Sequence, residues 1–430
     1  MELTLDLHSH SGYSGGVGQI DLSDMIHAME LKGLDIFGTG DAFHPAWGKF
    51  LKTNLKEIHE GLFSYQNLSD SKLFMLQSEI IVSFPMGKNK RKSFHLLILL
   101  PDFHSIDQIV KLFEKWEVKN TIGRPFLVCD SLVQLAERLA ALKEINPMIE
   151  IIPAHVMTPQ GVFGSVSPVD SLEEAFGSFS KEIKIIETGL SADPEILEMI
   201  PELKDKTFIS NSDCHSSDLR RIGREYTKVR VKDKSYSSII HALRNDEVVY
   251  TGEFSVSEGR FFLTGHRKGK KGHEESGIYF TPDKTPEDKK CPDCGKPLTI
   301  GVLERAYELA VRQGGKPKLP KTTRRQFITM VPLIELIAVS MKKTHTSKPV
   351  QALYHKIVSN SPETEFWFMD EKTMGGFLTE LSFEESMIED ILSVKKGNFS
   401  YFPFGYDGEY GKLVIGEKID LNLFSSEGRI

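Results

Sequence analysis

The residues with the clearest chemical potential are histidines and carboxylates that stand directly after short apolar segments. His8 and His10 follow the first of these segments, and Asp213 and His215 follow another one much later in the chain. Residues i and i+2 of an extended segment point to the same side, so both members of each pair can bind one metal ion. A single histidine in such a place is usually an ordinary polar residue, so a metal site is indicated only when several such places agree.

Three of four further candidates occupy comparable places. Asp41 and Glu79 each follow an apolar segment directly, and His155 lies two residues beyond one. His95 differs, because it opens the segment Phe94–Leu100. The carboxyl ends of strands in α/β folds converge on one face, where these folds assemble their sites. We therefore predict one metal centre with the following ligands: His8, His10, Asp41, Glu79, His95, His155, Asp213 and His215.

The composition of this ligand set indicates a catalytic centre and not a structural one. Imidazole and carboxylate without thiolate suit Zn, Mn or Fe in a polynuclear site. Glu79 and Asp213 have two oxygens each and can bridge two metals. Two ions ~3.5–4 Å apart can generate hydroxide and stabilise both the attacking and the leaving oxygen of an in-line displacement. We expect two or three divalent ions (Zn, Mn or Mg), with Glu79, Asp213 and His10 as the catalytic groups.

Alternating strand and helix patterns would position these ligands. One helical pattern is Asp21–Lys32, with Asp21 as its cap and Gly33 as its stop, and another is Ser131–Glu144, capped by Ser131. A repeated succession of strand and helix predicts a parallel α/β sheet, either open or closed into a barrel. The expected buried strands are Leu3–Leu7, Leu34–Thr39, Leu73–Ser78, Phe94–Leu100, Glu150–Pro153, Lys184–Thr188 and Thr207–Ser210.

The bulk properties of the chain fit a globular protein of a reducing compartment. Its 430 residues suffice for two or three domains, and 40% of them are hydrophobic and 26% charged. No segment has the ~18 uninterrupted apolar residues of a membrane-spanning helix, and the acidic start does not resemble a signal peptide. The chain has four cysteines, which argues against a disulfide framework and favours the cytoplasm.

Charge separates the middle of the chain from the part before it. Residues 1–255 have 27 basic and 36 acidic side chains, whereas residues 256–345 have 18 basic and 10 acidic ones. A basic segment in an acidic protein suits a partner that is itself a polyanion. The alternative is a solvated, lysine-rich linker.

Cys291 and Cys294 form a tight knuckle of the kind that binds zinc. Two more ligands are needed, and His266 and His273 lie upstream in the same basic segment. Either histidine could instead contact phosphate or face solvent. We expect one structural zinc held by these four residues.

These features divide the chain into three expected parts. Residues 1–255 would form the α/β barrel with the metal centre, and residues 256–325 a basic zinc-binding module. Residues 326–430 would form a mixed α+β domain, with helices over Phe327–Lys342 and near Phe383–Ser393.

The motifs of the first part resemble those of the PHP (polymerase and histidinol phosphatase) superfamily. The resemblance implies a distorted (β/α)7 barrel that holds up to three metal ions and hydrolyses phosphate esters. The superfamily usually has Thr-Asp-His after the second strand, where this chain has Thr39-Gly-Asp41, and His44 is then either a further ligand or a substrate contact. A ligand expected soon after His10 is missing, which leaves the third metal open. The motifs are His8-x-His10, Gly-Thr-Gly-Asp41, Ser-Glu79, Phe-His95-Leu-Leu-Ile-Leu, Pro-Ala-His155 and Ser-Asp213-Cys-His215.

Three later motifs extend the resemblance to the endonuclease Q-like branch of that superfamily. They are Gly-His266-Arg, Cys291-Pro-Asp-Cys294 and the segment Gly405–Gly411. In this branch a PHP barrel is followed by a zinc module and a C-terminal domain. Other members have a cysteine shortly after Gly-His-Arg, where this chain has a glycine, so His273 is the candidate fourth ligand. The resemblance implies cleavage of a DNA strand 5′ of uracil, hypoxanthine or xanthine, or at abasic sites.

Basic residues near these motifs are candidate contacts for damaged DNA, the expected partner. Arginine can hold phosphate bidentately, although a local ion pair is the common alternative. No membrane is expected, and a repair or replication partner protein is left open. Two rival functions are a phosphatase of a small phosphate ester and a non-catalytic DNA-binding scaffold. The candidate contacts are His44, Arg220, Arg221, Arg224, Arg267 and Lys268.

Overall fold

The computed structural model describes residues 1–15, 20–66, 68–69, 71–87, 89–316, 323–419 and 428–429. Its internal contacts divide the chain into two compact units. The first unit consists of residues 1–189, 202–253 and 323–328. The second unit consists of residues 190–201, 254–322 and 329–430. The three-part division inferred from the sequence stays a prediction.

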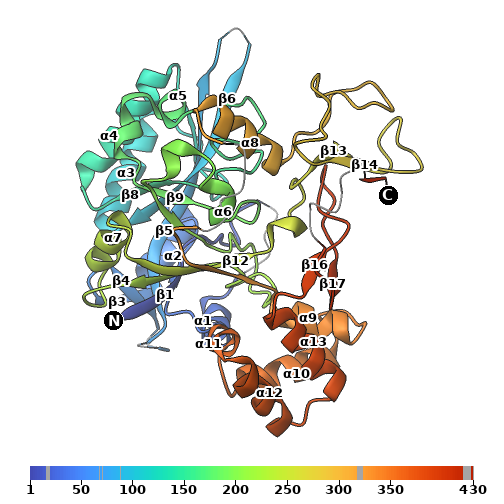
Figure 1. Cartoon of the computed structure of the whole chain (residues 1–430). Coiled ribbons are helices and arrows are strands. Elements are labelled where there is room, and N and C mark those ends of the chain that lie inside the picture. The colour runs from blue at the N-terminus through green and yellow to red at the C-terminus, as the bar shows by residue number, and fades with distance from the viewer. Residues whose placement is uncertain are drawn as a thin grey trace. The chain divides into compact units, whose positions relative to one another are not determined.

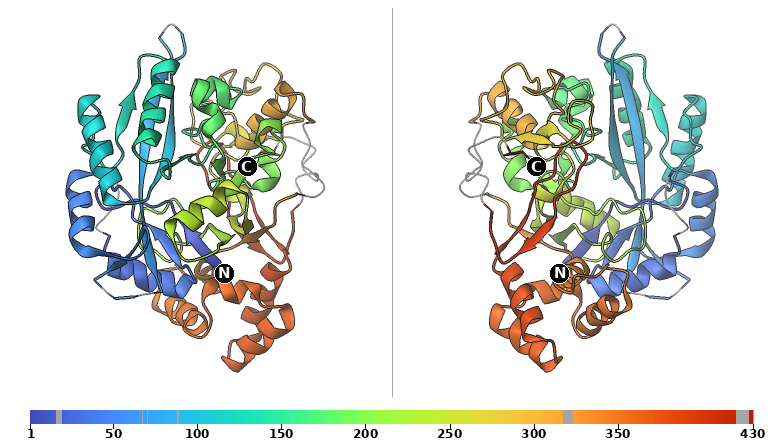
Figure 2. Two further views of the ribbon diagram at one scale, coloured as in Figure 1. Left: turned by 90° about the vertical axis from the view of Figure 1, so that its left-hand side faces the viewer. Right: turned by 90° about the vertical axis from the view of Figure 1, so that its right-hand side faces the viewer.

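The first unit is built on a large mixed sheet with helices packed against it (Figures 1 and 2). Its strand order is β15-β12-β11-β1-β2-β5-β4-β3, with β6 and β7 also paired to β5, and β8 paired to β6. Two further strands, β9 (Ile185–Glu187) and β10 (Thr207–Ile209), form a separate parallel pair. The large sheet contains β1 (Glu2–Asp6), β2 (Ile36–Gly38), β3 (Leu55–His59), β4 (Leu62–Tyr65), β5 (Leu73–Pro85), β6 (Arg91–Leu100), β7 (Phe126–Val128), β8 (Glu150–Pro153), β11 (Tyr226–Arg230), β12 (Val248–Phe254) and β15 (Phe327–Met330).

The expected α/β class is confirmed, but the expectation of a parallel sheet is wrong in part. β1, β2 and β5 are parallel neighbours, whereas β6 runs antiparallel to both β5 and β8. A short connection explains the difference. β5 ends at Pro85 and β6 begins at Arg91, and so few residues permit a hairpin but no helical crossover.

Contacts just beyond the strand ends link the two sheets of the first unit. The Val156 N–H donates to the Glu187 carbonyl beside β8 and β9, and the His10 N–H donates to the Cys214 carbonyl beyond β1 and β10. A parallel bridge joins Ser9 to Cys214 at the same place. The predicted (β/α)7 barrel stays a prediction.

The helices of the first unit begin where the sequence predicts caps. Asp21 caps α1 (Leu22–Lys32) by accepting from the Ser23 N–H, and Gly33 ends it with φ 80°. Ser131 caps α4 (Leu132–Ile145), which packs on β5, while α3 packs on β6 and α7 on β11. The other helices are α2 (Pro45–Asn54), α3 (Phe103–Lys115), α5 (Leu172–Phe176), α7 (Tyr236–Arg244) and the 3-10 turns Gly177–Glu182 and Pro201–Leu203.

A buried apolar cluster fills the interior of the first unit, and nearly every central strand contributes to it. Burial of such side chains is the main source of stability of the elements that carry the site. The contributors include Leu5, Ile36, Leu73, Leu97, Ile152, Ile185, Ile209 and Val229.

The second unit combines small sheets with a group of helices. The predicted helix Phe327–Lys342 is wrong at its start, because β15 occupies Phe327–Met330 and α9 begins only after Pro332. Proline lacks an N–H and disfavours the helical conformation in the residue before it, so the helix cannot extend backwards through this point. The elements are α6 (Pro194–Leu197), the 3-10 turn Val256–Glu258, β13 (Thr264–His266), β14 (Ile278–Phe280), α8 (Val302–Arg312), α9 (Leu333–Ser340), α10 (Lys348–Val358), α11 (Glu363–Phe368), α12 (Glu371–Glu380), α13 (Glu385–Lys395), β16 (Phe399–Tyr401), β17 (Leu413–Ile415) and β18 (Gly428–Arg429).

The predicted helix near Phe383–Ser393 is confirmed as α13. Among the residues that the structure describes, no helix combines the length and the apolar character that crossing a membrane requires.

Candidate metal centre

The first unit brings most of the predicted ligands together as two adjacent groups. One group is His8, His10 and Asp213, and the other is Glu79, His95 and His155. Within each group the ligand atoms lie within 4.8 Å of one another. Glu79 is placed to join the groups, because its Oε1 lies 2.6 Å from His95 Nδ1 and 3.7 Å from His8 Nε2.

The expectation that His95 opens its strand is wrong, because β6 begins at Arg91 and His95 lies in its middle. In the β5–β6 pair, His95 is opposite Ile81, two residues from Glu79. Residues two apart in a strand face the same side of the sheet, so Glu79 and His95 project from one face of the β5–β6 pair. Both side chains therefore reach the centre from inside their strands and not from strand ends.

Three residues of this region have a backbone conformation that L-amino acids rarely adopt. Asp41, His155 and Asp213 have φ angles of 44°, 32° and 46°. Left-handed conformations of non-glycine residues cost roughly 1–3 kcal/mol and gather at functional sites. Here they lie in the segments that follow strands β2, β8 and β10, two to four residues beyond each strand.

Several buried polar atoms of the centre have no hydrogen-bond partner. They are His8 Nε2, Glu79 Oε2 and Asp213 Oδ1. Leaving such an atom unpaired costs roughly 1–3 kcal/mol, a cost that a bound cation would remove. Imidazole and carboxylate donors in this arrangement fit divalent metals such as Zn or Mn.

The electrostatics of the centre also favour a cation. Burial alone would lower the pKa of His8, but Glu187, Asp213 and Glu79 raise it to about 10. Burial likewise opposes protonation of His10, and Asp213 and Asp41 nevertheless raise its pKa to about 9. The carboxylates therefore attract protons strongly, and divalent ions would satisfy the same negative charge.

Asp41 and His215, also predicted as ligands, lie beside these two groups and not within them. Asp41 Oδ1 lies 3.2 Å from His10 Nδ1, and its Oδ2 accepts from the N–H and hydroxyl of Ser11. Both oxygens are thus engaged, and Asp41 orients His10. His215 Nδ1 lies 2.9 Å from the Asp213 carbonyl, and its ring centroid lies 4.4 Å from that of His10.

Glu187 is a functional residue that the motifs missed. Both of its oxygens lie 3.0 Å from His8 Nδ1. Oε1 also accepts from Asn211 Nδ2 and Oε2 from the His155 N–H, each at 2.8 Å. A carboxylate behind a ligating histidine fixes its ring and raises its basicity. Its position at the end of an expected strand is the sequence signal that could have identified it.

Replacing Glu187 by glutamine should weaken metal binding about 10- to 100-fold, because the ring of His8 loses its charged partner. Titration with a fluorescent metal indicator would measure the affinity. Glu182→Gln, an exposed glutamate of the same unit, is the matched control. Equal metal affinity in both variants would contradict this role.

The candidate substrate residues of the first unit have distinct surroundings. His44 caps α2, accepts from the Trp47 N–H, and stacks on Tyr13 with ring centroids 4.4 Å apart. Arg224 donates through Nε and Nη2 to the Ser212 carbonyl, so it holds the backbone next to Asp213. Arg220 and Arg221 are half-buried and stay predicted phosphate contacts.

The second unit contains the predicted cysteine and histidine cluster. His273 Nε2 lies 3.2 Å from Cys291 Sγ, and His266 Nδ1 lies 3.4 Å from Cys294 Sγ. All four ligand atoms lie within 4.8 Å of one another. The opposite ring nitrogens face the carbonyls of Pro297 and Ser276, the usual arrangement behind zinc-bound histidines. These residues fit a tetrahedral zinc.

The two predicted basic contacts beside this cluster lie on its surface. The Arg267 N–H donates to Asp407 Oδ2, and its Nη1 lies 3.7 Å from Glu409 Oε1. Lys268 is exposed. Both side chains therefore stay predicted contacts for DNA phosphates.

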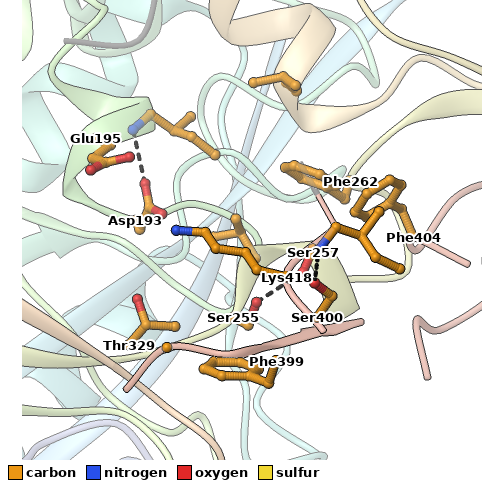
Figure 3. A pocket seen from close by; sticks show the side chains of 15 residues that line it. Asp193, Glu195, Ser255, Ser257, Phe262, Thr329, Phe399, Ser400, Phe404 and Lys418 are labelled. Carbon is orange, nitrogen blue, oxygen red and sulfur yellow. Dashed lines mark hydrogen bonds between the residues drawn. The ribbon is translucent and has the colours of Figure 1, made fainter. Parts of the chain in front are cut away.

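A separate cavity of about 340 Å³ lies within the second unit (Figure 3). Phe262, Phe399 and Phe404 line it together with Ser255 and Ser257. Aromatic rings beside hydroxyl groups suit a small, partly apolar molecule. Among the lining residues that the structure describes, none belongs to either metal-ligating cluster.

Comparison with solved structures shows that the whole fold is shared. The lesion-specific endonuclease Q of Pyrococcus furiosus is 27% identical, with a TM-score of 0.78 over 99% of this chain and 98% of that chain. Endonuclease Q in complex with a 27-mer duplex that carries an abasic lesion at the active site is 26% identical, with the same TM-score, over 99% of each chain. The likeness thus includes both units.

Comparison of sequences gives a partial match. An uncharacterized protein of Methanocaldococcus jannaschii is 29% identical over 278 residues, which are 62% of this chain and 33% of that protein. The chain thus spans about a third of the length of this relative. No family model matches the sequence.

Proposed function

We propose that this chain, an endonuclease Q-like member of the PHP superfamily, is a DNA repair endonuclease that hydrolyses the strand beside a damaged nucleotide. The observation that carries the proposal is the likeness to a lesion-specific endonuclease over 99% of the chain. The two groups of buried ligands give this fold the chemistry of a metal-dependent hydrolase. A soluble phosphate monoester would not require the second unit.

The finer parts of the proposal concern the lesion and the metals. We expect cleavage 5′ of uracil, hypoxanthine or xanthine, or at an abasic site, with 3′-hydroxyl and 5′-phosphate ends. An abasic duplex bound to endonuclease Q supports damaged DNA as the partner. We assign two or three divalent ions to the first unit and one structural zinc to the second.

The mechanism assigns a task to each group of the centre. When bound, divalent ions would supply an activated water and stabilise charge on the attacking and leaving oxygens. Glu79 lies within reach of both ligand groups and could bridge ions held by them. Asp41 holds the His10 ring and Glu187 the His8 ring, so both histidines are oriented before a substrate arrives. The side chains of these residues are themselves buried and thus shielded from bulk water.

The test is incision of a 5′-labelled duplex with one deoxyuridine, deoxyinosine or abasic site, in the presence of Mg, Mn or Zn. We expect one product, cut just 5′ of the lesion and abolished by chelator, with an undamaged duplex left intact. Hydrolysis of a phosphomonoester without incision would instead indicate a phosphatase. DNA binding without any metal-dependent product would indicate a scaffold.

A further inference from the structure

The loop between α3 and β7 brings to the metal centre an arginine to which no motif points. A bridge between Lys119 and Phe126 closes the loop. Asn120 Nδ2 donates to the Phe43 carbonyl at 2.6 Å, and the Gly123 N–H donates to the Tyr13 carbonyl at 3.0 Å. These bonds fix the loop on the segments that follow β1 and β2, the same segments that carry His10 and Asp41.

Gly123 shows how closely the loop approaches the centre. A Cβ atom at this position would lie 2.4 Å from Asp41 Cγ and 2.6 Å from its Oδ2. A side chain here would therefore push the loop away from the carboxylate that orients His10. On the other side of the arginine, the Pro125 carbonyl accepts from the Ile81 N–H at 2.9 Å. Both neighbours thus hold residue 124 in place.

The side chain of Arg124 points into the cluster. Its Nη1 lies 3.7 Å from Glu79 Oε2, the carboxylate oxygen that has no hydrogen-bond partner. Its Nε is buried and also has no partner, while 23% of the side chain is exposed. Guanidinium has five N–H donors in a fixed fork, which suits phosphate oxygens. Arg224 differs, because its Nε and Nη2 are both engaged by the Ser212 carbonyl.

The charge balance of the metal centre indicates a role for the Arg124 guanidinium. Asp41, Glu79, Glu187 and Asp213 supply four negative charges, which two divalent ions would neutralise. A phosphodiester then adds one negative charge, and more charge develops on its non-bridging oxygens as the attack proceeds. Arg124 supplies the matching positive charge beside Glu79 Oε2.

We infer that Arg124 binds a non-bridging oxygen of the scissile phosphodiester and stabilises it as the water attacks. The inference rests on the proposed phosphodiesterase activity and deepens it, since it names the group that grips the phosphate. Arg124 forms and breaks no covalent bond, and its proton stays on the guanidinium. Two substrates separate the two claims: the damaged duplex, and bis(4-nitrophenyl) phosphate, a minimal phosphodiester without a base.

Arg124→Gln should lower kcat about 10²- to 10³-fold on both substrates, the loss that follows removal of one donor to a developing oxyanion. Arg124→Lys should recover part of this loss, because lysine restores the positive charge but not the planar set of N–H donors of the guanidinium. Bound metal and the melting temperature should stay as in the unaltered protein. Arg230→Gln, which removes an exposed arginine of the same unit that faces Glu2, is the matched control.

Sulfur substitution of the two non-bridging oxygens at the cut site gives a second readout. The unaltered protein should discriminate between the two phosphorothioate diastereomers, and Arg124→Gln should reduce that discrimination. Full activity of Arg124→Gln, or loss of bound metal in proportion to activity, would overturn the inference. If bis(4-nitrophenyl) phosphate is hydrolysed while the damaged duplex is not, the DNA function fails and Arg124 is still tested. Absence of turnover of both substrates would contradict both claims.

Discussion

Replacing Asp213 by asparagine should reduce incision by ~10³-fold or more, while damaged duplex DNA still binds. Asp213 Oδ1 lies 3.2 Å from His10 Nε2 and 3.6 Å from His8 Nε2, and it has no hydrogen-bond partner. Asparagine keeps the shape but removes the charge that a divalent ion requires. A loss of ~4 kcal/mol of transition-state stabilisation corresponds to this factor.

Two measurements decide the role of Asp213. Single-turnover incision reports the chemical step, and a filter-binding titration at fixed salt reports DNA affinity, which depends mainly on phosphate contacts. Asp205→Asn, an exposed aspartate of the same unit, should leave both unchanged. If DNA affinity fell as much as incision, Asp213 would serve folding or binding and not the reaction.

Replacing Cys291 and Cys294 by serine should remove one zinc per chain and unfold the surrounding part of the second unit. The buried apolar cluster at this place contains only Ile278, Phe280, Leu298 and Cys291 itself among the residues that the structure describes. So small a core does not support a fold without a covalent or metal link. Structural zinc supplies roughly 10–16 kcal/mol of binding free energy in comparable small modules.

Zinc content by mass spectrometry and limited proteolysis between β13 and α8 would measure this effect. The double variant should lose zinc and be cleaved rapidly in this region. Cys129→Ala is the control, because Cys129 is buried in the first unit and belongs to neither ligand cluster. Unchanged zinc content in the double variant would contradict the assignment.

The sequence predicted the α/β class and the ligands because local patterns specify both. Apolar segments mark buried strands, and polar residues at their ends mark the face on which a site forms. Of the six ligands in the two groups, His8, His10, His155 and Asp213 follow strands and obey this rule, whereas Glu79 and His95 lie inside β5 and β6. The same rule extends to Glu187, which ends β9.

Two features depended on tertiary contacts and could not be predicted from local pattern. The antiparallel direction of β6 follows from its pairing with β5, so the reason why His95 reaches the centre became visible only in the structure. Arg124 lies in a loop without regular structure. Its position is set by bonds from Gly123 and Asn120 to distant residues, and no spacing in the sequence encodes these bonds.

The division of each unit into three stretches of chain has a consequence for dissection of the protein. A fragment that ends at residue 255 would lack residues 323–328, although the Gln326 carbonyl accepts from the Thr251 N–H at the edge of the large sheet. The same fragment would contain residues 190–201, which include α6, but it would lack α8, the helix against which α6 packs. A single cut in the chain therefore cannot release either unit intact. Recombination between relatives would have to exchange both units together.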